Sequence, residues 1–165
     1  MSTKDYSRKQ EHLIADTLGW DVVSGSGSRH TYPGDISSSE WLGECKTHQK
    51  PGSKIKFNRD VWNKIVEEAS SQFKYPVLFV DDGSQTVKNT WCMFPGSIRG
   101  IDSKMITLPV TFGKNILFDP YYMKSKIKSE RNTDINYRPI VYFTEFSTSV
   151  YITDLDTFSE LFGEK

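Results

Sequence analysis

The feature that most constrains the fold is a continuous apolar run, Pro76-Val77-Leu78-Phe79-Val80. A strand that is apolar on both faces has to be covered on both faces, as the central strands of α/β proteins are. Five candidate elements precede the run: a helix at 4–18, strands at 20–23, 34–36 and 41–46, and a helix at 58–73. The order helix, three strands, helix, strand therefore predicts an α/β fold, with a mixed central sheet flanked by helices.

Capping residues mark the ends of the expected helices. Ser2 or Thr3 can cap the first helix and Gly19 can end it, while Asn58 can cap the second helix. The chain between 50 and 56 is expected to be a loop, because it contains Pro51 and Gly52. The length of 165 residues fits a single domain, with a core at about 4–81 and a C-terminal strand and helix extension at about 82–165.

The C-terminal half gives weaker signals. We expect a strand at 90–94 and a hairpin that pairs 140–143 with 149–152. A last helix from 155 is expected to begin at the capping-box spacing of Thr153 and Asp156. The polar, lysine-rich segment 121–138 fits either a helix or a loose arm.

Composition narrows the classes of function. The chain has 21 basic and 21 acidic residues, so any affinity for nucleic acid must come from local charge placement. No apolar run approaches the ~20 residues that a membrane helix needs, and the N-terminus lacks the apolar stretch of a signal peptide. We therefore expect no membrane and a cytoplasmic protein with Cys45 and Cys92 as reduced thiols. The cysteines and histidines make no zinc-spaced set.

One constellation of residues points to metal chemistry. Glu44 and Lys46 stand two apart in an expected strand, so their side chains leave the same face. Asp35 lies nine residues before Glu44, and a hairpin could bring the two carboxylates together. Converging carboxylates repel unless a cation sits between them, and Mg²⁺ suits such oxygen ligands. A bound Mg²⁺ can activate water against a phosphodiester, with Lys46 beside the scissile phosphate.

The alternative reading of Glu44 and Lys46 is an ordinary surface ion pair, since Glu-x-Lys arises often by chance. Three features favour the metal site. Asp35 and the Glu44-Cys45-Lys46 triplet occur in the right order at hairpin spacing. Glu11 lies at the border of the apolar face of the first helix, where a solvent carboxylate is unusual. The small-residue loop 24–28 could let a phosphate approach backbone amides.

These residues together resemble a known family. The pattern runs from Glu11 through Gly19-Trp20-Asp21, the 24–28 loop and Pro33-Gly34-Asp35 to Glu44-Cys45-Lys46. It resembles the core of the PD-(D/E)xK nuclease superfamily, most closely the archaeal and phage Holliday-junction resolvases, over 4–81. The resemblance implies a restriction-endonuclease-like core in a prokaryotic cell or a phage-infected host.

The resemblance also implies roles for individual residues. Asp35, Glu44 and the main-chain carbonyl of Cys45 would be metal ligands, with Glu11 as a further ligand, direct or through water. Lys46 would be the catalytic lysine. Either Ser26 or Ser28 would match the loop serine that lies near the phosphate.

A run of basic residues follows the expected catalytic strand. It suggests a phosphate-contacting surface, which Arg29 could extend, although a solvated loop and helix start is the competing interpretation. The residues are Lys50, Lys54, Lys56 and Arg59, with Lys46 and Lys64 at its two ends.

The sequence as a whole predicts a DNA endonuclease that depends on Mg²⁺ or Mn²⁺ and cleaves branched DNA such as a Holliday junction. Symmetric cutting of a junction needs two active sites, so a homodimer is expected. One alternative is a restriction-type or repair endonuclease that acts on linear or damaged DNA. Another is a catalytically inactive nuclease fold that serves as a DNA-binding or interaction module.

Overall fold

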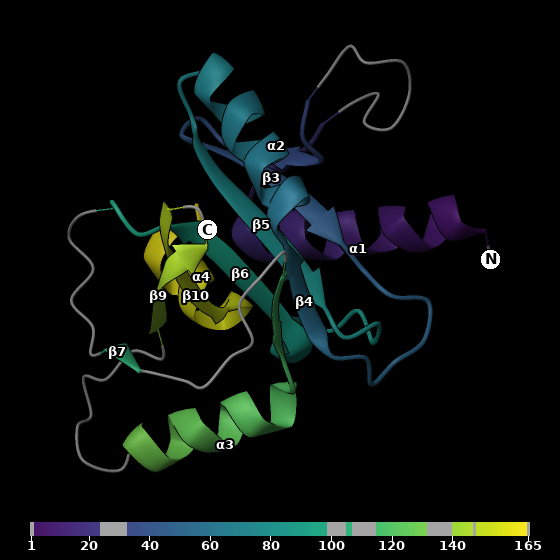
Figure 1. The fold of residues 1–165 in the computed structure, drawn as a ribbon. Helices are drawn as coiled ribbons and strands as arrows, with labels where there is room; N and C mark the ends of the chain where they lie inside the picture. The colour runs from purple at the N-terminus through teal and green to yellow at the C-terminus, as the bar shows by residue number, and fades with distance from the viewer. Residues whose placement is uncertain are drawn as a thin grey trace.

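A computed structural model describes residues 2–23, 33–98, 105–106, 115–131, 140–146 and 148–164 (Figure 1). The N-terminal half contains α1 (Thr3–Leu18), β1 (Asp21–Val22), β2 (Ile36–Ser37), β3 (Trp41–Lys46), β4 (Ile55–Asn58), α2 (Arg59–Ser71) and β5 (Tyr75–Asp81). The C-terminal half contains η1 (Val87–Asn89), β6 (Thr90–Pro95), β7 (Met105–Ile106), β8 (Asn115–Phe118), α3 (Pro120–Arg131), β9 (Ile140–Phe146), β10 (Thr148–Asp154) and α4 (Leu155–Phe162).

The main sheet is mixed, with the strand order β1-β2-β3-β5-β6-β10-β9-β7. β3 and β5 are parallel and are joined through α2, whereas β2 pairs with β3, and β6 with β5, in antiparallel fashion. The expected α/β fold with a mixed, helix-flanked sheet is confirmed. The apolar run forms β5, which is buried from Pro76 onward in the interior of the sheet.

The two faces of the sheet carry separate apolar clusters. On one face, Leu42 of β3 and Leu78 of β5 pack with Trp62 and Ile65 of α2. On the other face, the cluster contains Ile14 and Leu18 of α1 and Phe158 of α4, together with residues of β3, β5 and β6 (Figure 1). Side chains alternate across a strand, so neighbouring residues of β3 face different helices.

The caps expected for the first two helices are confirmed. The hydroxyl of Ser2 accepts a hydrogen bond from the Asp5 N–H, and Gly19 ends α1 in the left-handed conformation at φ 71°. The side chain of Asn58 accepts from the N–H groups of Asp60 and Val61. These local signals fix where both helices begin and where α1 ends.

Two expectations about local structure were wrong. The cap of α4 is Asp154, whose carboxylate accepts from the Thr157 N–H at 2.8 Å. Thr153 cannot serve because it is buried within β10, opposite Cys92 of β6. The end of the expected 50–56 loop belongs to β4, because Ile55 pairs with Phe118 of β8.

Of the segment with two interpretations, 121–138, the part up to Arg131 is helical and belongs to α3, and the rest lies outside the described residues. In the part of the chain described, no helix combines the length and apolar character needed to cross a bilayer.

Candidate active site

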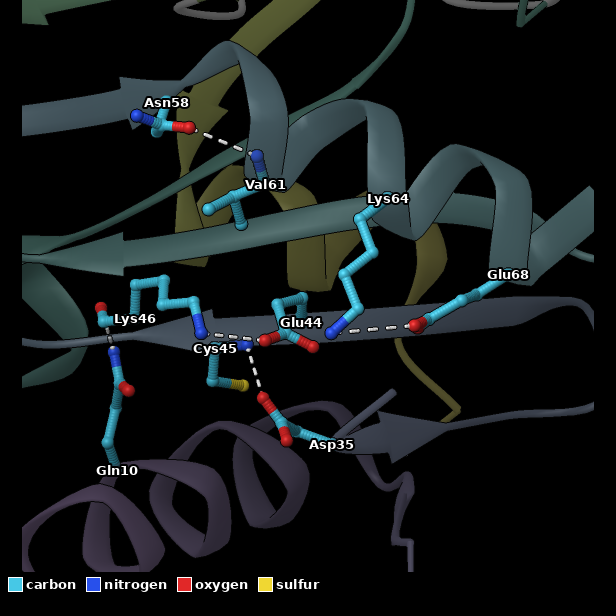
Figure 2. A network of polar contacts seen from close by, with 9 residues as sticks. All are labelled: Gln10, Asp35, Glu44, Cys45, Lys46, Asn58, Val61, Lys64 and Glu68. Atoms are coloured by element: carbon cyan, nitrogen blue, oxygen red, sulfur yellow. Dashed lines mark hydrogen bonds and ion pairs between the residues drawn. The ribbon is translucent and has the colours of Figure 1, made fainter. Parts of the chain in front are cut away.

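The β2–β3 hairpin places Asp35 beside the strand that carries Glu44 and Lys46. Ile36 is paired with Gly43, and the Asp35 N–H donates to the Gly43 carbonyl at 2.8 Å. The Cys45 N–H in turn donates to Asp35 Oδ2 at 2.9 Å (Figure 2). The predicted approach of Asp35 to the Glu44-Cys45-Lys46 triplet is therefore present in the structure.

Gly34 makes possible the turn that leads into β2. Its φ of +80° lies in the left-handed region, and a Cβ there would come within 2.6 Å of Leu42 Cδ1. A side chain at 34 would push the turn off the core, and Asp35 would move with it.

Glu44 and Lys46 share the face of β3 that lies under α2, as their spacing predicts. Lys46 Nζ lies 2.8 Å from Glu44 Oε1, and Lys64 reaches toward Glu44 from α2 (Figure 2). The Glu44 side chain is 16% exposed and the Lys46 side chain 51% exposed. A half-exposed amine can reach a solvent-borne phosphate while its partner carboxylate stays largely buried.

Three carboxylates come from neighbouring parts of the chain: Glu11 from α1, Asp35 from the position just before β2, and Glu44 from β3. Burial raises the pKa of Glu44, and the Asp35 carboxylate raises it further, although Lys46 and Lys64 oppose the rise. Burial, then Asp35, then Glu44 raise the pKa of Glu11 to about 7. Burial disfavours the Lys46 ammonium, but the neighbouring Glu44 carboxylate outweighs this and raises the pKa of the amine. The site therefore holds an excess of negative charge that a cation would relieve.

The carboxylates beside Lys46 are of the kind that Mg²⁺ binds, but they do not form a complete protein cage. Within the described ranges, no three His, Cys, Asp or Glu side chains are grouped closely enough to hold a metal ion by themselves. Mg²⁺ does not need such a group, because it usually takes one or two carboxylates and keeps several waters. Asp35 and Glu44 are two such carboxylates, close enough for Asp35 to raise the pKa of Glu44. The Cys45 carbonyl faces the same edge of β3 as its N–H, which is the edge where Asp35 lies.

The expected DNA-contacting residues fall into three groups. Ser26, Ser28 and Arg29 lie outside the described residues. Lys50, Lys54 and Lys56 are all exposed along the connection from β3 to α2. Arg59, the first residue of α2, is partly buried and makes interactions within the protein.

Sequence reasoning missed two buried polar residues near the end of β3. Gln10 of α1 is fully buried, and its Nε2 donates to the Lys46 carbonyl at 2.7 Å. Asp81 of β5 is also fully buried and accepts from the Thr47 hydroxyl at 2.6 Å. A signal for Gln10 was present, because it stands four residues before Ile14 on the buried face of α1.

Comparison with protein-family models, with curated proteins and with solved structures gave no match for this chain. The assignment of a function therefore depends on the geometry of the site.

Proposed function

We propose that this protein is a DNA endonuclease that uses Mg²⁺ or Mn²⁺ and acts on branched DNA. The observation that supports this most strongly is that Asp35 raises the pKa of Glu44, and both raise the pKa of Glu11, beside the amine of Lys46. Interacting, partly buried carboxylates are costly for a fold, and perturbed ionisation of this kind concentrates at functional sites. The order α1-β1-β2-β3-α2-β5, with β4 of the second sheet between β3 and α2, is also compatible with the nuclease core that the sequence resembles.

In this proposal each residue has a distinct task. Asp35, Glu44 and the Cys45 carbonyl would hold the metal ion, with Glu11 as a further ligand, direct or through water. When bound, the ion polarises the phosphodiester and lowers the pKa of a water molecule. Lys46 remains protonated and donates hydrogen bonds to a phosphate oxygen, where it stabilises the developing charge. Glu44 orients the amine of Lys46 through their ion pair.

The surface beside the site supports nucleic acid as the substrate. The net charge is zero, so attraction to DNA requires a local concentration of basic groups. Lys50, Lys54 and Lys56 supply it on the segment that follows Lys46 directly. We propose a homodimer, because two sites are needed to cut a four-way junction symmetrically.

One observation favours a second candidate, the inactive nuclease fold that serves as a binding module. Lys46 and Glu44 are already paired at 2.8 Å, and that pair requires no metal for its stability. A fold that had lost catalysis could keep this pair as a structural ion pair. The endonuclease is preferred because a structural pair does not account for the nearby Asp35 and Glu11.

A cleavage panel tests the proposal. The substrates are a four-way junction, a Y-fork, a linear duplex and a single strand, each with Mg²⁺ and with a chelator. We expect cutting only with the metal and fastest on the junction. Fastest cutting of linear duplex would point to the restriction-type or repair enzyme. Tight binding without any cleavage would favour the inactive module.

A further inference from the structure

Two hydrogen bonds, from two different elements, hold the chain at Lys46 and Thr47. Gln10 Nε2 donates to the Lys46 carbonyl at 2.7 Å, and the next residue, Thr47, donates its hydroxyl to Asp81 Oδ1 at 2.6 Å. One bond comes from α1 and the other from the last residue of β5. We call Gln10, Thr47 and Asp81 the Lys46 clasp.

The clasp lies at the C-terminal end of β3, where the pairing of β3 with its neighbouring strands ends. β2 is paired with β3 only at Leu42 and Gly43, and the parallel pairing with β5 ends at Lys46 opposite Val80. Strand ends that lack neighbours open more readily than strand interiors. Lys46 is the last residue of its strand, so its side chain would share any fraying of that end.

The clasp residues are buried at a cost to the fold. Gln10 and Asp81 are fully buried, yet within the described part of the chain Gln10 Oε1 and Asp81 Oδ2 have no hydrogen-bond partner. Burial also raises the pKa of Asp81. An apolar residue at either position would remove these unpaired oxygens, but it would leave the Lys46 carbonyl, or the Thr47 hydroxyl and the Gly83 N–H, without the partner that it has now. The polar side chains therefore serve the chain at the end of β3 and in the turn after β5.

A second set of contacts fixes the clasp itself. Gln85 Nε2 donates to the Tyr6 carbonyl at 2.6 Å, and the Tyr6 hydroxyl donates to the Gly83 carbonyl. The Gly83 N–H donates to Asp81 Oδ1 at 3.2 Å. Tyr6 stands one helical turn before Gln10, so α1 and the turn after β5 hold the end of β3 between them.

We propose that Gln10 and Asp81 are positioning residues for the Lys46 amine. They act by fixing the backbone at Lys46 and Thr47, so that the long side chain starts from one defined point. The effect on catalysis follows from the proposed endonuclease function. The ordering of Lys46 does not depend on that function and can be measured without DNA.

Substitutions of nearly equal shape test the clasp. Thr47→Val removes the hydroxyl and keeps the volume, whereas Thr47→Ser keeps the hydroxyl and is the matched control. Gln10→Met removes the donor from the other side. We expect Thr47→Val and Gln10→Met to lower the single-turnover cleavage rate about 10- to 100-fold at saturating DNA, as small displacements of a reacting group do. Thr47→Ser should retain most of the rate.

A double substitution separates positioning from general damage. If the clasp acts through the amine, Thr47→Val should cause no further loss of rate in a Lys46→Ala background. A full additional loss in that background would show that Thr47 acts on the site by another route, which would overturn the proposal.

The second readout is the NMR order parameter of the Lys46 side-chain Cε, with Lys64 as the reference lysine. We expect it to fall in Thr47→Val and Gln10→Met and to hold in Thr47→Ser. An unchanged value in folded Thr47→Val protein overturns the proposal, whatever the cleavage result. If the value falls as expected but wild-type protein cuts no DNA, the endonuclease proposal fails and the positioning of Lys46 stands. Should Gln10→Met fail to fold, the Thr47 pair decides alone.

Discussion

The Cys45 N–H donates to Asp35 Oδ2 at 2.9 Å, just beyond the point where β2 stops pairing with β3. This bond sets the carboxylate of Asp35 against the strand that bears Glu44 and Lys46. The Asp35 carboxylate thereby occupies the edge of β3 beyond Gly43, where main-chain pairing with β2 would otherwise continue.

Removing the Glu44 charge should separate binding from cleavage. Glu44→Gln loses a proposed metal ligand and a negative charge that would face the phosphate. We expect DNA affinity to stay equal or increase, while cleavage falls below detection. Binding measured by fluorescence anisotropy in Ca²⁺, beside cleavage in Mg²⁺, checks both parts. Wild-type cleavage by the variant at saturating DNA would refute the role of Glu44.

Lys46 should matter for chemistry much more than for folding. Its side chain is half-exposed, and exposed ion pairs contribute at most ~1 kcal/mol to stability. Lys46→Ala should therefore melt close to the wild-type temperature, while the single-turnover rate falls ~100-fold or more. A folded variant that cuts at the wild-type rate would mean that Glu44 and Lys46 form only a surface ion pair.

The exposed lysines after β3 should set the salt dependence of binding. Lys54→Ala with Lys56→Ala should weaken DNA binding and reduce the slope of log K against log salt by about one unit for each lost phosphate contact. Lys88→Ala, at an exposed lysine of η1, is the control and should leave the slope unchanged. An unaltered slope in the double variant would assign Lys54 and Lys56 to an ordinary solvated surface.

Glu11 should make stability depend on pH. Burial, Asp35 and Glu44 raise its pKa from 4.5 to about 7, so the folded state binds this proton more tightly than the unfolded state. The associated stability is present below about pH 4.5 and is lost as pH rises through 7. In chelator, Glu11→Gln should therefore melt above wild type at pH 8 and match it near pH 4. Mg²⁺ should reduce the difference in melting temperature between the two proteins at pH 8. A difference in melting temperature that is the same at every pH would contradict the role given to the raised pKa of Glu11.

Gly34 offers a test of how Asp35 is placed. Gly34→Ala combines a left-handed φ with a close contact to Leu42, and we expect a loss of about 1–3 kcal/mol and slower cleavage. Gly52→Ala is the matched control, because Gly52 has a similar φ of +84° with nothing within 4 Å of an added Cβ. Equal destabilisation of the two variants in urea melts would show that the contact with Leu42 does not cause the loss of stability.

Much of the site could be predicted because its signals are local. The bounds of β3 and the caps at Ser2 and Asn58 depend on residues close together in the chain. The hairpin that brings Asp35 to Cys45 is also short, so few alternative arrangements compete with it. Local spacing was sufficient to place Asp35, Glu44 and Lys46 in one neighbourhood.

The missed features depend on contacts between distant parts of the chain. β4 has only four residues, and its partner β8 begins at Asn115, so the alternation of Ile55 and Phe57 was too short to stand out. The spacing of Gln10 from Ile14 places it on the buried face of α1, but no local pattern shows that it bonds to the Lys46 carbonyl. The bond between Asp81 and Thr47 likewise joins residues far apart in the chain.

We propose that Asp35 and its neighbours hold a metal ion with which the protein cuts DNA. Single-turnover cleavage by wild type and Asp35→Asn, on whichever substrate of the panel wild type cuts fastest, tests this most directly. We expect wild type to cut in Mg²⁺ and to stop in chelator, while folded Asp35→Asn binds the same DNA and does not cut it. Wild-type cleavage that persists in chelator, or Asp35→Asn protein that cuts at the wild-type rate, would contradict it.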